Sequence, residues 1–183
     1  LTGNFAIKKF AIQAVPVGDL EINSHSLDEK LELTGKLKGN SDLEFSGNID
    51  PTKGNLDLNA KIQKLDMKLI PEFIRDYVSR ASGDISGDLQ LTGTTSDPRF
   101  NGYVHFDTTT FALAELNTPY RINDQRIEIK YPDFQFKNFV ISDTTGNKLT
   151  VDGTVKMIDA SEYGLNLKAN SKNFVALDAP RRS

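Results

Sequence analysis

The sequence predicts an all-β protein, and three observations support this prediction. Apolar and polar residues alternate along most of the chain, as in Leu31-x-Leu33 and Leu43-x-Phe45, which is the pattern of strands with one covered face. About a dozen such runs recur at intervals of roughly 8–12 residues, the spacing typical of all-β architectures. Turn-forming residues separate the runs, for example at residues 50–54 and 96–98. We therefore expect an antiparallel sheet with one dry face and one wet face.

A finer motif, apolar-x-apolar-x-Gly-x-apolar, repeats in the runs that begin at Leu31, Leu43, Leu89 and Leu149, although the run at Leu89 ends in Thr95. In each run the glycine has the parity of the apolar residues and so belongs to the dry face. Glycine there marks a β-bulge, or it lets the sheet bend and another surface approach closely. The predicted bend glycines are Gly35, Gly47, Gly93 and Gly153.

One segment breaks the two-residue period. Residues 71–80 carry apolar side chains at positions 73, 74, 77 and 78, which is helical spacing. Pro71 and Glu72 suit the first turn of a helix, and Arg80 suits the last turn. The pattern predicts one short amphipathic helix over residues 71–80, which would cap one end of the sheet.

Large aromatic side chains are frequent between residues 100 and 141. They fit the core of a closed sandwich, and they equally fit the lining of a groove that accepts an acyl chain. We favour a groove because the apolar runs are similar and serially repeated, as in a quasi-one-dimensional array. The candidate lining residues are Leu33, Phe45, Leu58, Leu91, Phe106, Phe136 and Val151.

Composition argues against catalysis and nucleic-acid binding. The 183 residues include no Cys and two His, which leaves no thiolate chemistry and little basis for a Ser–His–Asp triad or a zinc site. The net charge of -3 gives no basic footprint for nucleic acid. We therefore expect no enzymatic activity, no catalytic or metal residues and no cofactor. No apolar run reaches the roughly 18 residues of a membrane-spanning helix.

Two consecutive stretches carry a family resemblance. Residues 81–94 read ASGDISGDLQLTGT and residues 97–104 read DPRFNGYV, and together they resemble the repeated glycine and leucine signature of the TamB family. This is the DUF490 translocation and assembly module family, which is related to AsmA-like proteins. Residues 116–122, 139–144 and 148–155 resemble its Bacteroidetes branch. The similarity is strongest over residues 65–178.

The resemblance implies a fold and a role. Family members form a β-taco, an elongated, folded-over sheet with an apolar inner face, and they are anchored in the inner membrane and extend through the periplasm. They are implicated in phospholipid transport between membranes and in outer-membrane protein assembly with an Omp85-type partner. We therefore expect residues 1–183 to be a single β-rich segment, the C-terminal-half fragment of a longer envelope protein. Its groove would shield phospholipid or unfolded outer-membrane protein. The alternative is a periplasmic or surface β-sandwich that binds glycan or protein through exposed aromatics such as Tyr103 or Tyr131.

Overall fold

The computed structural model describes residues 2–175 apart from residues 13, 72–75, 116–117 and 159–161. These residues form a twelve-stranded antiparallel sheet together with a short 3₁₀ helix, η1. The predicted all-β, antiparallel architecture is confirmed. The elements are β1 Thr2–Ile12, β2 Val15–Leu27, β3 Lys30–Gly39, β4 Asp42–Ile49, β5 Asn55–Asp66, η1 Met67–Leu69, β6 Val78–Ser82, β7 Asp84–Thr94, β8 Pro98–Leu113, β9 Pro119–Lys130, β10 Asp133–Ser142, β11 Lys148–Met157 and β12 Tyr163–Ser171.

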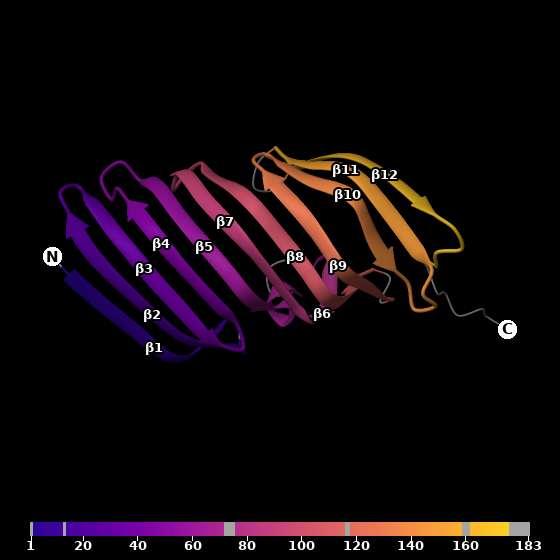
Figure 1. Ribbon diagram of the computed structural model, residues 1–183, viewed down its shortest axis with the longest axis horizontal. Coiled ribbons are helices and arrows are strands. Elements are labelled where there is room, and N and C mark those ends of the chain that lie inside the picture. The colour runs from indigo at the N-terminus through magenta and orange to yellow at the C-terminus, as the bar shows by residue number, and fades with distance from the viewer. Residues whose placement is uncertain (1, 13, 72–75, 116–117, 159–161, 176–183) are drawn as a thin grey trace.

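The strands follow one another across the sheet as a meander, so strand order is chain order from β1 to β12. The exception is β6, which pairs with the far end of β8 while β7 pairs with the rest of it. Figure 1 shows a single elongated, twisted layer with the N-terminus at one end and the C-terminus at the other. The described residues do not form the two packed sheets of a sandwich, so the architecture of the alternative hypothesis is wrong.

Side chains of one parity form rows that cross the sheet from strand to strand, because antiparallel partners stand opposite each other. We call the side that carries the following row the apolar face, and the opposite side the polar face. The row runs through Phe5, Ile22, Gly35, Phe45, Ala60, Leu89, Gly102, Ile129, Phe134, Val155 and Leu165.

Fully buried apolar residues gather at one end of the apolar face, the end at which β2, β4, β7, β9 and β11 begin. We call it the plugged end. Leu69 of η1 is 3% exposed and covers the first of two clusters there. The clusters are built on Val17, Leu37 and Leu69, and on Ile122, Phe139 and Val151.

Of the helix predicted over residues 71–80, residues 72–75 lie outside the described residues, and residues 71 and 76–80 lie within them. Helical backbone is found earlier, at η1, where the N–H of Lys68 donates to Asp66 Oδ1 (2.9 Å), and at residues 70 and 71. The prediction is wrong for residues 78–80, which belong to β6. Val78 pairs with Leu113 of β8, so a strand ladder satisfies this backbone in place of a helical turn.

The four glycines predicted on the apolar face serve two different purposes. Gly47, Gly93 and Gly153 have φ of +151°, +92° and +126°, and a Cβ at any of them would overlap a carbonyl oxygen nearby. These positions require glycine because L side chains rarely adopt such backbone angles. Gly35 is different, because the phenyl ring of Phe45 on the next strand occupies the space that its side chain would fill.

Two β-bulges on opposite halves of the sheet have the same construction. Lys9 in β1 and Asn138 in β10 have φ of +53° and +48°, and each lies at a shift in strand register. The N–H of Lys9 donates to Asp19 Oδ1 (2.9 Å), and the N–H of Asn138 donates to Asp152 Oδ1 (2.7 Å). In both bulges a carboxylate on the adjacent strand satisfies an N–H that the ladder leaves free.

The two bulges also lie in matching sequences. Residues 5–12 read FAIKKFAI and residues 134–141 read FQFKNFVI, with identical Phe, Lys, Phe and Ile at equivalent positions. Phe10 packs against the first buried cluster, and its counterpart Phe139 belongs to the second. The two ends of the sheet therefore repeat one hairpin design.

We expect Gly153→Ala to lower the free energy of unfolding by roughly 1–3 kcal/mol, because it forces an L side chain into a strained backbone conformation. The matched control is Gly164→Ala on the neighbouring strand. A Cβ at Gly164 meets no atom closer than 3.7 Å, so this variant should differ from the parent by less than about 0.5 kcal/mol. Urea unfolding followed by circular dichroism measures both. Equal effects would contradict a specific requirement for glycine at position 153.

Candidate apolar groove

Four of the predicted lining residues lie together on the apolar face, on four consecutive strands of the sheet. Leu58 of β5 and Leu91 of β7 are direct cross-strand partners. Leu33 of β3 stands in the same row, separated from Leu58 by Gly47 of β4. Phe45, also on β4, belongs to the adjacent row. The glycine leaves a gap between the two leucines, so the row has a recess as well as projecting side chains.

These four side chains are only half-buried, although they sit in the middle of the sheet. The accessible surface of the chain is 11820 Å², whereas a compact protein of 20.3 kDa is expected to expose about 8,800 Å². Much of the excess reflects a sheet with no second layer over it. Within the described residues, the apolar face beside Leu33, Leu58 and Leu91 is therefore an open apolar surface.

This surface reaches both edges of the sheet. Phe5 on the edge strand β1 is 57% exposed, and Leu165 on the edge strand β12 is 72% exposed. Both belong to the row that passes through Phe45. Exposed apolar side chains that gather on one face of a protein mark candidate interaction sites.

The other three predicted lining residues lie elsewhere on the apolar face. Phe106, Phe136 and Val151 pack in the second buried cluster at the plugged end. The rings of Phe106 and Phe136 meet Phe139 edge-on, with centroids 5.8 Å and 5.4 Å away. Val151 is only 9% exposed. The structure thus brings Leu33, Phe45, Leu58 and Leu91 together and places the remaining three in the wall that closes one end.

Charged side chains keep to the polar face, where they alternate in sign from strand to strand. Lys36 Nζ lies 3.4 Å from Glu44 Oε1 across β3 and β4, and both side chains are well exposed. Exposed pairs of this kind contribute little to stability, but they keep the polar face hydrated and the protein in solution. The alternating row consists of Glu21, Lys36, Glu44, Lys61 and Asp88.

His105 lies on the polar face, close to two aspartate side chains. His105 Nε2 lies 3.0 Å from Asp124 Oδ1, and its Nδ1 lies 3.4 Å from Asp107 Oδ1. Within the described ranges, no group of three or more His, Cys, Asp or Glu side chains is placed to hold a metal ion. No helix among the described residues is long and apolar enough to cross a membrane.

Tyr103, one of the two tyrosines proposed as glycan contacts, is already engaged. Its hydroxyl donates to Asp88 Oδ2 (2.7 Å), and this hydrogen bond raises the pKa of Tyr103. The guanidinium of Arg126 lies 3.6 Å from the ring centroid, in cation–π contact. One face of the ring is therefore covered by the protein itself.

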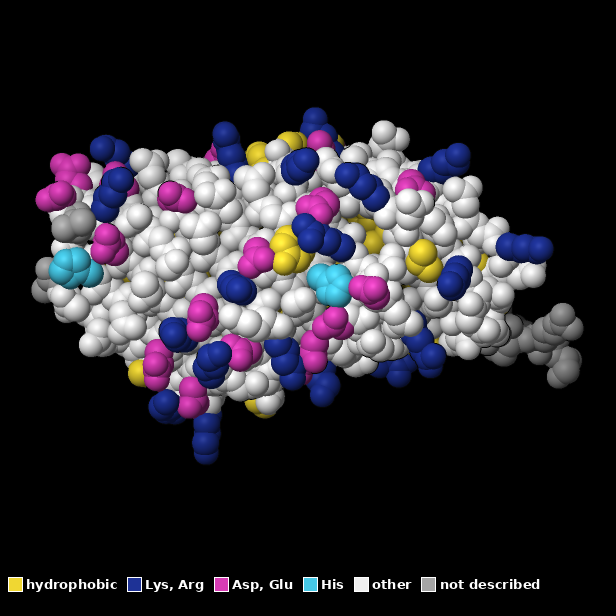
Figure 2. Space-filling view, in the orientation of Figure 1, with side chains coloured by type: hydrophobic (Ala, Val, Ile, Leu, Met, Phe, Trp, Pro, Cys, Tyr) yellow, Lys and Arg dark blue, Asp and Glu magenta, His cyan; other side chains and the backbone are white. Residues whose placement is uncertain are grey.

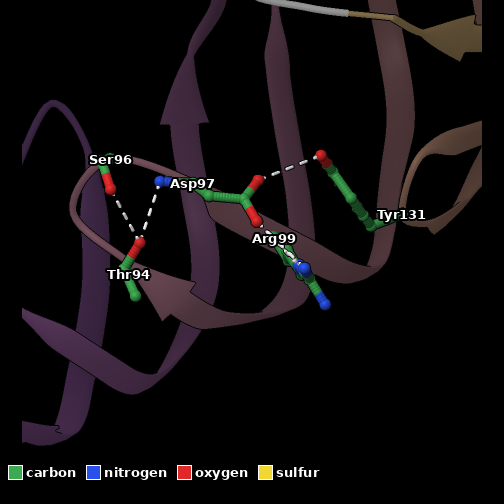
Figure 3. Close-up of polar contacts among 5 residues, drawn as sticks. All are labelled: Thr94, Ser96, Asp97, Arg99 and Tyr131. Carbon is green, nitrogen blue, oxygen red and sulfur yellow. Dashed lines mark hydrogen bonds and ion pairs between the residues drawn. The ribbon is translucent and has the colours of Figure 1, made fainter.

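Tyr131 is engaged in a similar way at the turn between β7 and β8 (Figure 3). Its hydroxyl donates to Asp97 Oδ1 (3.3 Å), while Arg99 Nη2 lies 3.0 Å from Asp97 Oδ2. The same turn is closed by Thr94 Oγ1, which accepts from the N–H of Asp97 (3.1 Å). This network ties the β7–β8 turn to the end of β9.

Asp143 is a structural residue at the plugged end to which the sequence analysis assigned no role. It is 2% exposed, and its carboxylate accepts hydrogen bonds from the N–H (2.9 Å) and hydroxyl (2.7 Å) of Thr145 and from the N–H groups of Asn147 and Val175, both at 2.9 Å. Burial by itself would raise the pKa of Asp143. The hydrogen bonds outweigh burial and hold the pKa well below its usual range.

The contact with Val175 brings the segment after β12 back over the sheet. Next to Val175, the ring of Phe174 stacks on Tyr120 with centroids 5.6 Å apart and an interplanar angle of 14°. Tyr120 in turn contacts Phe111, which packs against the second cluster. Asp143 therefore helps to hold an aromatic cover at the plugged end.

Comparison with known proteins gives one match. The family model of the TamB C-terminal domain matches residues 28–139, more than half of the chain. The match runs from the turn before β3 into β10 and includes the strands that carry Leu33, Phe45, Leu58 and Leu91. Searches of curated proteins and of solved structures give no match.

We expect Asp143→Asn to destabilise the protein at neutral pH and to change the response to acid. Because the folded-state pKa of Asp143 is depressed, its stabilising effect is complete above its unfolded-state pKa of about 3.9 and is lost as the pH falls further. The stabilities of parent and variant should therefore converge below about pH 4. Urea unfolding between neutral and acidic pH measures this difference.

The matched control is Asp57→Asn, which changes an exposed carboxylate on the polar face. Its stability should follow the parent curve throughout. A constant gap between Asp143→Asn and the parent across the acidic range would show that the charge of Asp143 contributes nothing.

Proposed function

The chain belongs to the TamB family, and on that premise we propose that its open apolar face shields phospholipid acyl chains, or unfolded outer-membrane protein, from water. Family membership assigns the chain at a coarse level to the cell envelope and to outer-membrane assembly. The observation that carries the finer proposal is the row of half-buried leucines on β3, β5 and β7, which no described residue covers.

The mechanism needs only continuous apolar contact. An acyl chain lying across the sheet would exchange water for the side chains of Leu33, Phe45, Leu58 and Leu91, at about 0.8 kcal/mol for each methylene fully buried. The recess at Gly47 gives such a chain a place between neighbouring leucines. An unfolded apolar segment of protein would use the same surface.

The proposal includes no catalytic step and no cofactor. The alternating charged side chains lie on the polar face, and the most strongly perturbed carboxylate, Asp143, is occupied by structural hydrogen bonds at the plugged end. A bound apolar chain would therefore meet no charged row. The charged face would remain in water while the opposite face holds the cargo.

The proposal also includes the setting of the full-length protein. We place this segment in the periplasm, with an inner-membrane anchor elsewhere in the protein and an Omp85-type protein as the outer-membrane partner. In that setting the apolar row from Phe5 to Leu165 crosses the whole sheet and carries exposed apolar side chains at both edges.

A photocrosslinking amino acid at Leu91 tests the proposal directly. We expect it to capture phospholipid or outer-membrane protein segments in the cell envelope, because its side chain lies on the open apolar face. The matched control carries the same amino acid at Thr92, which neighbours Leu91 in β7 and faces the other side of the sheet. Mass spectrometry of the adducts identifies the cargo, and equal capture at both positions would contradict the proposal.

Leu91→Asp provides a second measurement on the purified chain. If the face is open, we expect co-purifying lipid to be lost, as judged by native mass spectrometry and solvent extraction, with a cooperative melt retained. Thr92→Asp should retain the lipid, since Thr92 lies on the polar face, between Asp57 and Arg99 of the neighbouring strands. A parent protein without lipid, together with a Leu91→Asp variant that no longer melts cooperatively, would instead indicate a closed core.

A further inference from the structure

The polar face carries a trough that the proposed function does not use. It crosses β3, β4, β5, β7 and β8 and has a volume of about 600 Å³. One wall is a row of uncharged polar side chains and the other is the row of alternating charges, with the backbone of the intervening row as the floor. The uncharged wall consists of Thr34, Ser46, Asn59, Gln90 and Asn101.

The dimensions of the trough suit a single extended polymer. The walls are two residues apart on each strand, a spacing of about 7 Å, and neighbouring strands are about 4.8 Å apart, so five strands give a length of roughly 19 Å. The floor consists of backbone alone, because the side chains of the intervening row, from Gly35 to Gly102, point to the apolar face. A narrow channel at right angles to the strands thus presents one side chain per strand along its length.

The uncharged wall has hydrogen-bonding capacity that the protein does not use. Thr34, Ser46, Asn59 and Gln90 are exposed, and their side chains make no hydrogen bond to any other described residue. Asn101 accepts the N–H of Tyr131 with Oδ1 (3.3 Å) and keeps its amide N–H₂ group free. The wall therefore offers hydroxyl and amide groups, both donors and acceptors, in a regular series.

The electrostatics favour a neutral occupant. In the charged wall, Lys36 and Lys61 alternate with Glu44 and Asp88, so the positive and negative charges cancel along the trough. Such a wall does not attract a polyanion as a basic groove would. Figure 2 shows this face of the molecule, where an uncharged area in the left half is bordered below by interleaved Lys or Arg and Asp or Glu side chains, and hydrophobic side chains are few.

We propose that this trough binds a neutral glycan strand. A linear polysaccharide with hydroxyl or acetamide groups on every sugar presents hydrogen-bonding groups at a regular spacing, which matches a wall with one polar side chain on each strand. An extended peptide is a poorer match, because peptides that join a sheet use free backbone groups at an edge strand, and the strands under the trough are paired on both sides. The site lies opposite the apolar face and uses none of its side chains, so either role can fail without the other.

Titration of the isotope-labelled chain with chitohexaose, a neutral linear glycan, tests the proposal. The side-chain amide signals of Asn59, Gln90 and Asn101 in nitrogen–proton NMR spectra report directly on the uncharged wall. We expect saturable shifts of these signals. The double variant Asn59→Ala/Gln90→Ala should weaken binding at least tenfold, because these cross-strand partners form the centre of the wall.

Asn166→Ala is the matched control, since it removes an exposed amide from the same face on β12, outside the trough. It should bind as the parent does, and all variants should keep the parent melting temperature. The proposal is overturned if the wall signals do not move at millimolar glycan, or if shifts are confined to Leu58 and Leu91 on the apolar face. It is equally overturned if a neutral Ser- and Asn-rich decapeptide shifts the wall signals and chitohexaose does not.

Discussion

Backbone hydrogen bonding between neighbouring strands is the interaction on which the rest of this molecule depends. A compact domain also gains stability by packing one layer against another, but the described residues form a single sheet. Complete burial of apolar side chains is concentrated at the plugged end, where Leu69 covers one cluster and Phe174 stacks over Tyr120 beside the other. Backbone hydrogen bonds between strands therefore hold the middle of the sheet together, and this is why the apolar face can remain open there.

A single layer leaves two large surfaces, and the two-residue period of the strands gives each surface its own chemistry. Leu58 and Leu91 project to one side, while their chain neighbours Asn59 and Gln90 project to the other. Each strand thus contributes a leucine to the apolar surface and, at the adjacent position, an amide side chain to the hydrogen-bonding surface. Both surfaces remain exposed to solvent in the middle of the sheet, because the buried clusters on the apolar face are confined to the plugged end.

Much of this fold could be predicted from the sequence, because alternation is a local signal. The pattern around Leu31 and Leu43 correctly indicated strands and the side on which their apolar residues lie. The prediction of a helix reaching residue 80 was wrong because Val78, one of the four apolar positions on which it rested, begins strand β6. Pairing with β8, 28 to 35 residues further along the chain, makes residues 78–82 a strand.

Features that depend on distant partners were beyond sequence reasoning. The turn at Asp143, Thr145 and Asn147 has a local signature, but the contribution of Val175 comes from 32 residues further along the chain. Alternation also could not separate the open part of the apolar face from the plugged end, because Leu91 and Val151 occupy equivalent positions in the same motif. Only the placement of Phe174 and η1 distinguishes them.

The repeated hairpin has a consequence for how such a sheet can change in length. The bulges at Lys9 and Asn138 lie in strands that run in the same direction, because eight antiparallel pairings separate β1 from β10. Loss of a single strand between them would reverse every later strand and move the second bulge and its buried cluster to the opposite end of the sheet. Loss or gain of two strands would leave both in place. The natural unit of growth in this architecture is the hairpin, so related chains should differ in length by whole hairpins.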